Sequence, residues 1–223
     1  ELNKHLIANV KGTLGPRVDL GDVLELSVLN RILRWVPNDV DGSERIEIEG
    51  DPRHAEILAF TMGLTMKSNT VSSPGVKPKN VASSAPELDD VNRTKYRSVT
   101  MRMAYLAQDR PDLQYTCKEL ARKMQSPNED DMTALKRAVR YVIGVPRVVV
   151  RFVRQRRRAH LDVYSDSDAA GCIRTRKSTS STIVMHGDHC IRTSSTTQGV
   201  IALSSGEAEF YALVKGSSIG IGS

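Results

Sequence analysis

The sequence predicts an α/β (α+β) fold in which a helical middle region separates two parts that contain strands. Three observations support this prediction. Runs rich in β-branched or alternating residues occur near residues 28–49 and again from residue 148, and apolar residues recur at helical spacing between residues 94 and 144. A capped helical segment then follows residue 204. The 223 residues are enough for one large domain or two small ones.

Composition narrows the class of protein. Hydrophobic residues make up 39% of the chain and charged residues 26%, which is typical of a globular protein. No apolar run approaches the roughly 20 residues of a membrane-spanning helix, and no signal peptide opens the chain. Three widely spaced cysteines argue against a disulfide framework and for a reducing compartment. We therefore expect an intracellular protein that is not secreted and has no membrane partner. Because the chain starts at Glu1 in mid-pattern, we also expect a piece of a longer protein.

The first part of the chain predicts a hairpin followed by a helix. Residues 28–36 and 45–49 are β-compatible runs on either side of a turn-rich loop. Asp51 and Pro52 suit the N-cap and the first position of a helix that Gly63 ends. The next segment, residues 67–92, is rich in Ser, Pro, Asn and Lys, so we interpret it as a linker.

Three helices are predicted between residues 94 and 144. The first carries an apolar stripe over residues 96–106 and breaks before Pro111, after which the second begins. The third has Ser126 as its expected N-cap and Glu129 as the partner in a capping box. Acidic residues in its first turn and basic residues later in the helix complement the helix dipole.

A strongly basic segment spans residues 93–158, with 17 Lys and Arg against 6 Asp and Glu, a local balance of +11. Such a segment is typical of a surface that binds the phosphates of nucleic acid. Scattered charges on the helices are equally compatible with solvated faces of a plain helical bundle. A cluster between the predicted strands 148–153 and 161–164 is denser than a solvated face requires. This cluster contains Arg151, Arg154, Arg156, Arg157 and Arg158.

Four carboxylates near the C-terminal end are candidates for a metal site. Asp166 and Asp168 follow a predicted strand and would share one face if that strand continued, although we expect it to end and Asp168 to begin a turn. Glu207 and Glu209 open the last helix, where Ser204 and Glu207 form a capping box that leaves Glu209 without a capping role. A strand-end aspartate and a helical glutamate, brought together by a small sheet, are typical of divalent-metal sites for phosphodiester chemistry.

Five segments occur in the order and at the spacing of one known family. Two are helical, MAYLAQDRPDLQY (after Tyr96-Arg97-Ser98) and SPNEDDMTALKRAVRYVIG. Three surround the carboxylates, namely YSDSDAAG, RTRKSTSS and ALSSGEAEFYAL. By these motifs the chain resembles, from about residue 28 to its end, the Pol polyproteins of copia-type retrotransposons. The matching part is the C-terminal region of the reverse transcriptase and the N-terminal part of ribonuclease H.

The resemblance implies four regions. These are the end of the reverse transcriptase palm with a hairpin and a helix (1–66), a linker (67–92), a helical thumb or connection region (93–146) and a truncated ribonuclease H-like domain with a mixed sheet and one helix (147–223). It also implies that the rest of the polyprotein is a partner and that the protein resides in a cytoplasmic particle or the nucleus.

The family hydrolyses the RNA strand of RNA/DNA hybrids with two Mg²⁺ ions, and Mn²⁺ can replace them. Asp166 and Glu209 match the family's first two metal ligands and form the implied catalytic pair, with Asp168 as an additional candidate. Three residues in the loop before the second strand of that region are candidate nucleic-acid contacts or, alternatively, parts of an exposed loop. They are Arg174, Arg176 and Lys177.

The sequence also departs from the family pattern. Ribonuclease H sites use further carboxylates from a later strand and helix, yet no Asp or Glu follows Glu209 here. Ala169 and Ala170 stand where the family usually has a Trp, which removes a packing residue. We therefore expect this chain alone to be inactive. The alternative function is a catalytically incomplete remnant that only binds nucleic acid through its basic segment.

Overall fold

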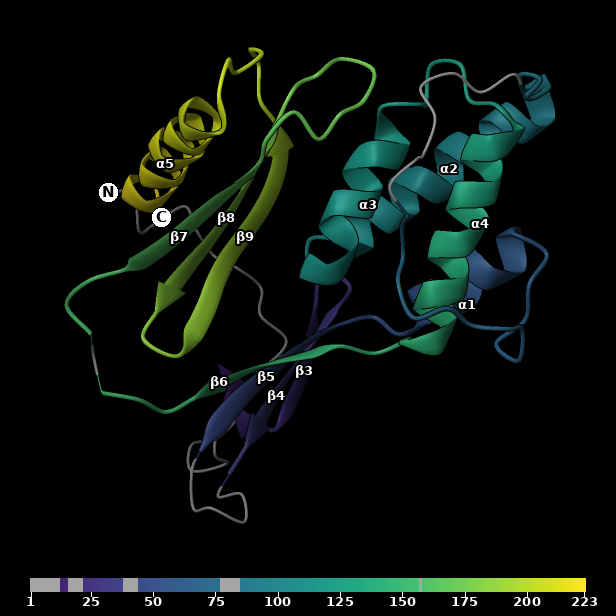
Figure 1. The fold of residues 1–223 in the computed structure, drawn as a ribbon. Helices are drawn as coiled ribbons and strands as arrows, with labels where there is room; N and C mark the ends of the chain where they lie inside the picture. The colour runs from purple at the N-terminus through teal and green to yellow at the C-terminus, as the bar shows by residue number, and fades with distance from the viewer. Residues whose placement is uncertain (1–12, 16–21, 38–43, 77–84, 157) are drawn as a thin grey trace, which may run out of the picture. The chain divides into compact units, whose positions relative to one another are not determined.

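The computed structural model describes residues 13–15, 22–37, 44–76, 85–156 and 158–223. Helices and largely antiparallel sheets make up these parts, which confirms the predicted α+β class (Figure 1). The chain divides into two compact units, Glu1–Asp51 with Val149–Arg156 and Pro52–Val148 with Arg157–Ser223. None of the helices in the described part of the chain has both the length and the hydropathy to cross a bilayer.

The first unit is built on a four-stranded antiparallel sheet. Its strands, in spatial order, are β3 (Glu25–Val28), β4 (Arg31–Val36), β5 (Arg45–Gly50) and β6 (Val149–Val153). The short strands β1 (Thr13–Leu14) and β2 (Asp22–Val23) form a separate parallel pair. Because β6 pairs with β5, residues 149–153 belong to this sheet, whereas the sequence grouped them with the C-terminal region. The four predicted domain ranges otherwise stay a prediction.

The predicted hairpin between β4 and β5 is confirmed by their antiparallel register, from Arg31 opposite Gly50 to Val36 opposite Arg45. The prediction of one uninterrupted run over residues 28–36 is wrong. Leu29 and Asn30 have φ angles of 49° and 58° and turn the chain between β3 and β4. Two consecutive residues with positive φ give a turn whose twist matches that of the flanking strands, so a tight hairpin forms inside the run.

The second unit opens with a helical core. Its helices are α1 (Arg53–Thr61), α2 (Asp90–Leu106), α3 (Pro111–Ala121) and α4 (Glu129–Gly144). Their apolar stripes meet in one cluster of buried side chains, including Leu58, Met103, Leu113 and Val139. The hydroxyl of Tyr96 donates a 2.8 Å hydrogen bond to the Leu120 carbonyl, so this large aromatic residue is buried with its polar atom satisfied.

Two helix starts differ from the prediction. α4 is capped by Asn128 rather than Ser126, because Asn128 Oδ1 accepts from Asp131 N at 2.9 Å and Asp131 Oδ2 accepts from Asn128 N at 3.1 Å. Asn128 itself has extended backbone angles and forms a β-bridge with Glu87, so the helix begins only after it. α1 begins at Arg53, with Pro52 in the N-cap position and no side-chain cap bond.

The C-terminal region consists of a three-stranded sheet and one helix; the sheet is antiparallel throughout its described strands, where we expected a mixed sheet. The strands are β7 (Asp162–Asp168), β8 (Thr179–His186) and β9 (His189–Thr197), in that spatial order, and the helix is α5 (Ser205–Ile221). Small residues of α5 pack on one face of the sheet: Ala208, Ala212 and Gly216 are buried at intervals of four residues. Figure 1 shows α5 on one side of this sheet and α3 on the other.

Candidate functional site: an acidic, hydroxyl-lined groove

Asp166 and Asp168 lie on the same face of β7. From the sequence we expected the strand to end before Asp168. It continues instead, because β8 pairs with it as far as Asp168, which lies opposite Thr179. Side chains two residues apart on a strand point to the same side. The partner strand therefore creates an aspartate pair that the local sequence does not fix.

Hydroxyl side chains continue the polar surface from the two carboxylates across the neighbouring strands of the sheet. Asp166 lies opposite Ser181, which in turn lies opposite Ser195. Asp168, two residues further along β7, lies opposite Thr179 of β8. Residues directly opposite each other in antiparallel strands share a face. The surface is thus acidic at β7 and rich in neutral hydroxyls across β8 and β9.

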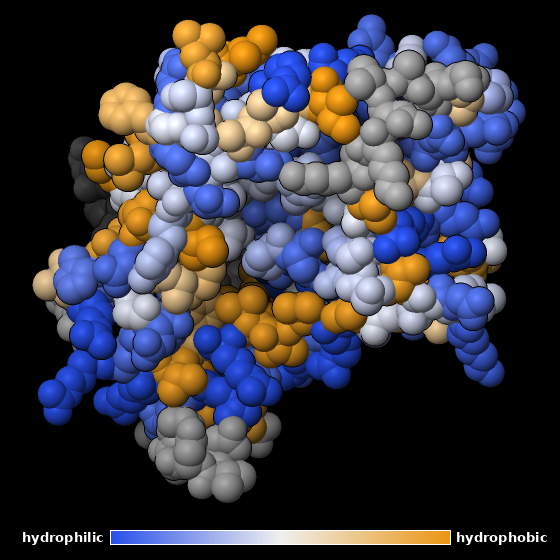
Figure 2. All heavy atoms as spheres, viewed as in Figure 1, coloured by the Kyte–Doolittle hydropathy of each residue, from blue (hydrophilic) through white to orange (hydrophobic). Residues whose placement is uncertain are grey.

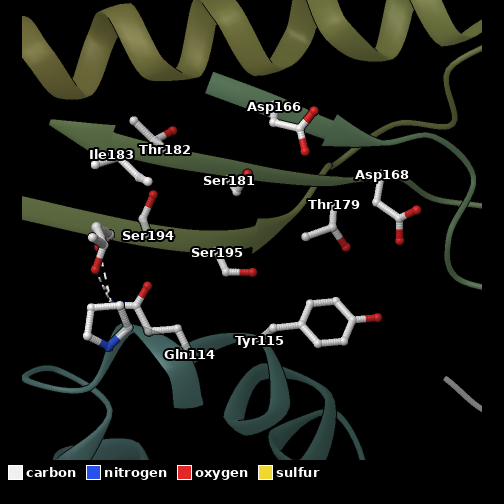
Figure 3. Close-up of a pocket in the computed structure, with 12 residues that line it drawn as sticks. Gln114, Tyr115, Asp166, Asp168, Thr179, Ser181, Thr182, Ile183, Ser194 and Ser195 are labelled. Atoms are coloured by element: carbon white, nitrogen blue, oxygen red, sulfur yellow. Dashed lines mark hydrogen bonds between the residues drawn. The ribbon is translucent and has the colours of Figure 1, made fainter. Parts of the chain in front are cut away.

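Helix α3 forms the opposite wall of this surface. The sheet face and the α3 residues Pro111, Gln114 and Tyr115 enclose a groove of about 340 Å³, into which Figure 3 shows the two aspartates and the hydroxyl groups pointing. Gln114 Nε2 donates a 2.7 Å hydrogen bond to Thr193 Oγ1 across it. Figure 2 shows the hollow between the sheet and α3. We call this space the acidic groove.

Lys118 places a positive charge near the acidic groove. Its Nζ donates a 2.7 Å hydrogen bond to Thr179 Oγ1, lies 4.5 Å from the centre of the Tyr115 ring and pairs with Glu119 at 2.9 Å. Sequence reasoning assigned no role to this residue. Its signal was the polar spacing of four residues from Gln114 on a helix whose other face is apolar.

Because Gly171 has no side chain, it leaves room for the carboxylate of Asp168. A Cβ atom at Gly171 would lie at or within 3.0 Å of Cγ and both oxygens of that carboxylate. Gly171 N also donates a 3.2 Å hydrogen bond to the Asp168 carbonyl, which closes the turn after β7. This role was missed from the sequence, although the glycine stands in the motif YSDSDAAG.

Glu209 does not line the acidic groove. It is exposed on α5, and α5 packs on the face of the sheet opposite the two aspartates. In the parts of the chain that the structure describes, no group of three or more His, Cys, Asp or Glu residues is arranged to hold a metal ion. The structure thus unites Asp166 with Asp168, while the predicted pairing of Asp166 with Glu209 stays a prediction.

The expected capping role of Glu207 is present. Ser204 Oγ accepts a 3.1 Å hydrogen bond from Glu207 N, and Glu207 Oε2 accepts a 2.7 Å bond from Leu203 N. The hydroxyl of Tyr211 donates a further 3.0 Å bond to Glu207 Oε1. This carboxylate therefore fixes the start of α5.

The arginine cluster is exposed and partly neutralised by its own sheet. Arg151 pairs with Glu47 at 3.4 Å and Arg154 with Glu44 at 3.2 Å. Arg156 and Arg158 are exposed, and Arg157 lies outside the described residues. The positive charge left for a phosphate contact is therefore smaller than the sequence count suggests.

The three basic residues of the loop after β7 have different environments. Arg174 and Arg176 are exposed, and Arg176 has a positive φ of 55°. Lys177 is half-buried, and its Nζ donates a 2.5 Å hydrogen bond to the Gly199 carbonyl. The loop therefore presents two solvated guanidinium groups, while Lys177 has a structural contact.

Cys172 in the same loop has an activated thiol. Burial raises the pKa of this thiol, but hydrogen bonds from Thr175 and Arg122 outweigh it and hold the pKa at about 7. Arg122 Nη2 lies 3.1 Å from Cys172 Sγ and so links the end of α3 to the loop.

The chain is 37% identical over 164 residues to "Retrovirus-related Pol polyprotein from transposon RE2" of Arabidopsis thaliana, covering 73% of this chain and 11% of that protein. It is 33% identical over 214 residues to "Retrovirus-related Pol polyprotein from transposon RE1" of the same plant, covering 96% of this chain and 14% of the relative. The chain belongs to the copia-type retrotransposon Pol polyproteins.

This polyprotein segment also resembles a shorter protein. It is 30% identical over 161 residues to "Uncharacterized mitochondrial protein AtMg00810" of Arabidopsis thaliana, covering 72% of this chain and 65% of that protein. No family model matches the chain, and no solved structure matches it. The family predicted from the five motifs is confirmed, and the chain spans 11% and 14% of the two Pol relatives.

Proposed function

We propose that this Pol segment joins the reverse transcriptase to ribonuclease H and that its acidic groove takes part in hydrolysing the RNA strand of RNA/DNA hybrids. The observation that carries the proposal is the pair Asp166 and Asp168, which point from one strand into one groove. The family membership supports it, because the pair lies in the motif YSDSDAAG through which the sequence resembles the family's nuclease.

The donor atoms of the groove suit Mg²⁺, and also Mn²⁺. Carboxylate oxygens are hard ligands, and Mg²⁺ is commonly bound by one or two carboxylates together with waters and substrate phosphates. When bound, the metal would polarise a phosphoryl oxygen and lower the pKa of a water molecule. Asp166 and Asp168 would hold the ion against β7. The hydroxyls of Ser181 and Thr179 would donate hydrogen bonds to substrate oxygens beyond it.

A second ion requires more oxygen ligands than this pair supplies. Glu209 enters the proposal through its position in the family motif, whereas Asp168 enters through its geometry. Among the described residues the structure supports one acidic position rather than a complete two-metal centre. We therefore propose that the full polyprotein, rather than this segment by itself, is the active nuclease.

The test compares three aspartates of the same strand. We expect Asp166→Asn and Asp168→Asn to reduce hybrid cleavage by the full polyprotein about 100-fold or more, because each removes a charged metal ligand. Asp162→Asn is the matched control, since Asp162 also lies on β7 but does not line the groove. Unchanged cleavage by the Asp166→Asn polyprotein would refute the proposal.

A second function, nucleic-acid binding without cleavage, is favoured by the exposed arginines and by the incomplete metal site. In that case hybrid affinity falls steeply with salt, with a logarithmic slope of roughly −0.7 to −0.9 for each phosphate contacted. Arg156→Ala with Arg158→Ala should weaken binding and reduce the slope, while Asp166→Asn should leave both unchanged. Salt-independent binding would contradict this alternative.

A further inference from the structure

Helix α3 has two chemically different faces. Leu113, Cys117 and Leu120 are buried in the helical core. Gln114, Lys118 and Arg122 recur at intervals of four residues and therefore form a second stripe, which we call the polar stripe. The helix is thus anchored in the core by apolar contacts and presents polar side chains to the sheet.

Each member of the polar stripe is hydrogen-bonded to one residue of the C-terminal region. Gln114 bonds to Thr193 of β9 at 2.7 Å, and Lys118 bonds to Thr179 of β8 at 2.7 Å. Arg122 bonds to the sulfur of Cys172, in the loop after β7, at 3.1 Å. The three contacts therefore span the sheet from its far strand to the loop beside the Asp168 turn.

The interface between α3 and the sheet is not close-packed. The acidic groove occupies about 340 Å³ of it, and a second hollow of about 300 Å³ lies between α2, α3 and β9. Well-packed interiors contain few voids larger than a water molecule. Separation of the sheet from α3 would expose polar groups that water can satisfy, whereas the apolar face of α3 would stay in the helical core.

We infer that α3 is a removable lid over the acidic groove, held shut by the polar stripe. The inference rests on the proposed function for the identity of the substrate. A groove of about 340 Å³ is at the small end of ligand pockets, which span roughly 300–1,000 Å³, so it has room for a nucleotide-sized group. While Pro111, Gln114 and Tyr115 form its opposite wall, the space beside Asp166 and Asp168 has room for a nucleotide-sized group but is too small for a double-stranded hybrid. The closed arrangement is autoinhibitory, and hybrid binding must compete with the hydrogen bonds of the polar stripe.

The experiment measures the distance between the helical core and the sheet with α5. Spin labels on α4 and α5 report this distance by pulsed electron resonance, since both chosen positions are exposed. Cysteine pairs are introduced by Thr133→Cys and Lys215→Cys, and the accessible native thiols are removed by Cys172→Ser and Cys190→Ser. Serine at position 172 keeps an acceptor for Arg122, and Cys117 is buried.

The spin-labelled chain that carries only these four substitutions, which we call the background chain, should give one narrow distance distribution. Gln114→Leu combined with Lys118→Met should broaden it and add a longer component, and Thr193→Val should do the same from the sheet side. Lys123→Met is the matched control, because Lys123 lies just beyond α3 and pairs with Asp131 at 3.8 Å instead of contacting the sheet. Circular dichroism confirms that each variant keeps its helices.

The outcomes separate the lid from the nuclease. An RNA/DNA hybrid should shift the background chain toward the longer distance. An identical narrow distribution in the double variant and in Thr193→Val, or hybrid bound in the groove at the short distance, would overturn the lid. If the variants open but hybrid affinity does not respond to Asp166→Asn, the lid stands and the proposed function fails.

Discussion

Substitution of Gly171 by alanine tests whether the Asp168 carboxylate occupies the position that the structure assigns to it. A Cβ atom at residue 171 would overlap the carboxylate, while the backbone there is not in the left-handed region. The substitution therefore acts on the side chain of Asp168 rather than on backbone strain. Moving that side chain off its rotamer costs about 0.5–1.5 kcal/mol, and overpacking costs about 1–3 kcal/mol. We expect Gly171→Ala to lower the free energy of unfolding by about 1–3 kcal/mol.

The same change should weaken metal binding. Displacement of an oriented ligand typically reduces affinity about 10–100-fold, so Mn²⁺ titration followed by electron resonance should show a loss of this size. Gly199→Ala is the control, because a Cβ atom there meets nothing within 4 Å and its φ is not positive. It should change the free energy of unfolding by less than about 0.5 kcal/mol.

A double-mutant cycle decides whether the effect passes through Asp168. In an Asp168→Ala background the carboxylate is gone, so Gly171→Ala should be close to neutral and the coupling energy should be about 1 kcal/mol or more. Equal destabilisation in both backgrounds would refute the placement of the carboxylate, and so would Mn²⁺ affinity that Gly171→Ala leaves unchanged.

Three further predictions concern other contacts. Gly220→Ala should lower the free energy of unfolding by about 1–3 kcal/mol in urea denaturation, because its Cβ would lie 2.6 Å from Val163 Cγ2 and lift α5 from β7. Arg110→Met should cost about 3–5 kcal/mol, because Arg110 is 2% exposed and donates to Asp112 at 2.7 Å. Burial raises the pKa of Asp112, but the hydrogen bond and charge of Arg110, together with hydrogen bonds from Tyr141 and the backbone, outweigh burial, so the folded pKa lies below its usual value. The stabilisation is then complete above the unfolded pKa and lost as pH falls through the folded one, and this acid-side slope should disappear in the variant. Alkylation of Cys172 should show a midpoint near pH 7, measured by mass spectrometry.

Local chemistry explains why the helices were predictable. Apolar spacing and capping residues act within a few positions, and they identified α2, α3 and α4 within a few residues of their ends and α5 at its start. The start of α4 was misplaced because a distant segment holds it: Leu88 N donates to the Pro127 carbonyl and Glu129 N to the Pro86 carbonyl. These bonds flank the bridge that holds Asn128 in an extended conformation, and Asn128 then caps the helix.

The candidate site was only partly predictable because its walls come from distant parts of the sequence. Asp166 was identified from its motif, but the continuation of β7 to Asp168 depends on pairing with Thr179. Gln114 lines the same groove and Lys118 bonds to Thr179 of its wall, and both come from a helix more than 40 residues upstream. Their spacing of four residues indicates a polar stripe on the helix, but the neighbouring sequence does not show which part of the protein that stripe contacts.

The orientation of α5 decides how Glu209 can act together with Asp166. Ala208 and Gly216 face the sheet, and the next residue of a helix lies about 100° around its axis, so Glu209 points away from that contact. It also lies on the opposite face of the sheet from Asp166, and the sheet itself separates the two. β7 is an edge strand of the described sheet, so a shared metal site would have to form around that edge rather than in the acidic groove.

The two arrangements differ in their second ligand. For a site in the groove, we expect Asp168→Asn to weaken Mn²⁺ binding about as much as Asp166→Asn, with Glu209→Gln near wild type. For a site at the edge of β7, Glu209→Gln would match Asp166→Asn, and Asp168→Asn would have little effect. The geometry favours the groove, because Asp166 and Asp168 both line it without any movement of α5. An Asp168→Asn chain that binds Mn²⁺ with unchanged affinity would show that the groove is not the metal site.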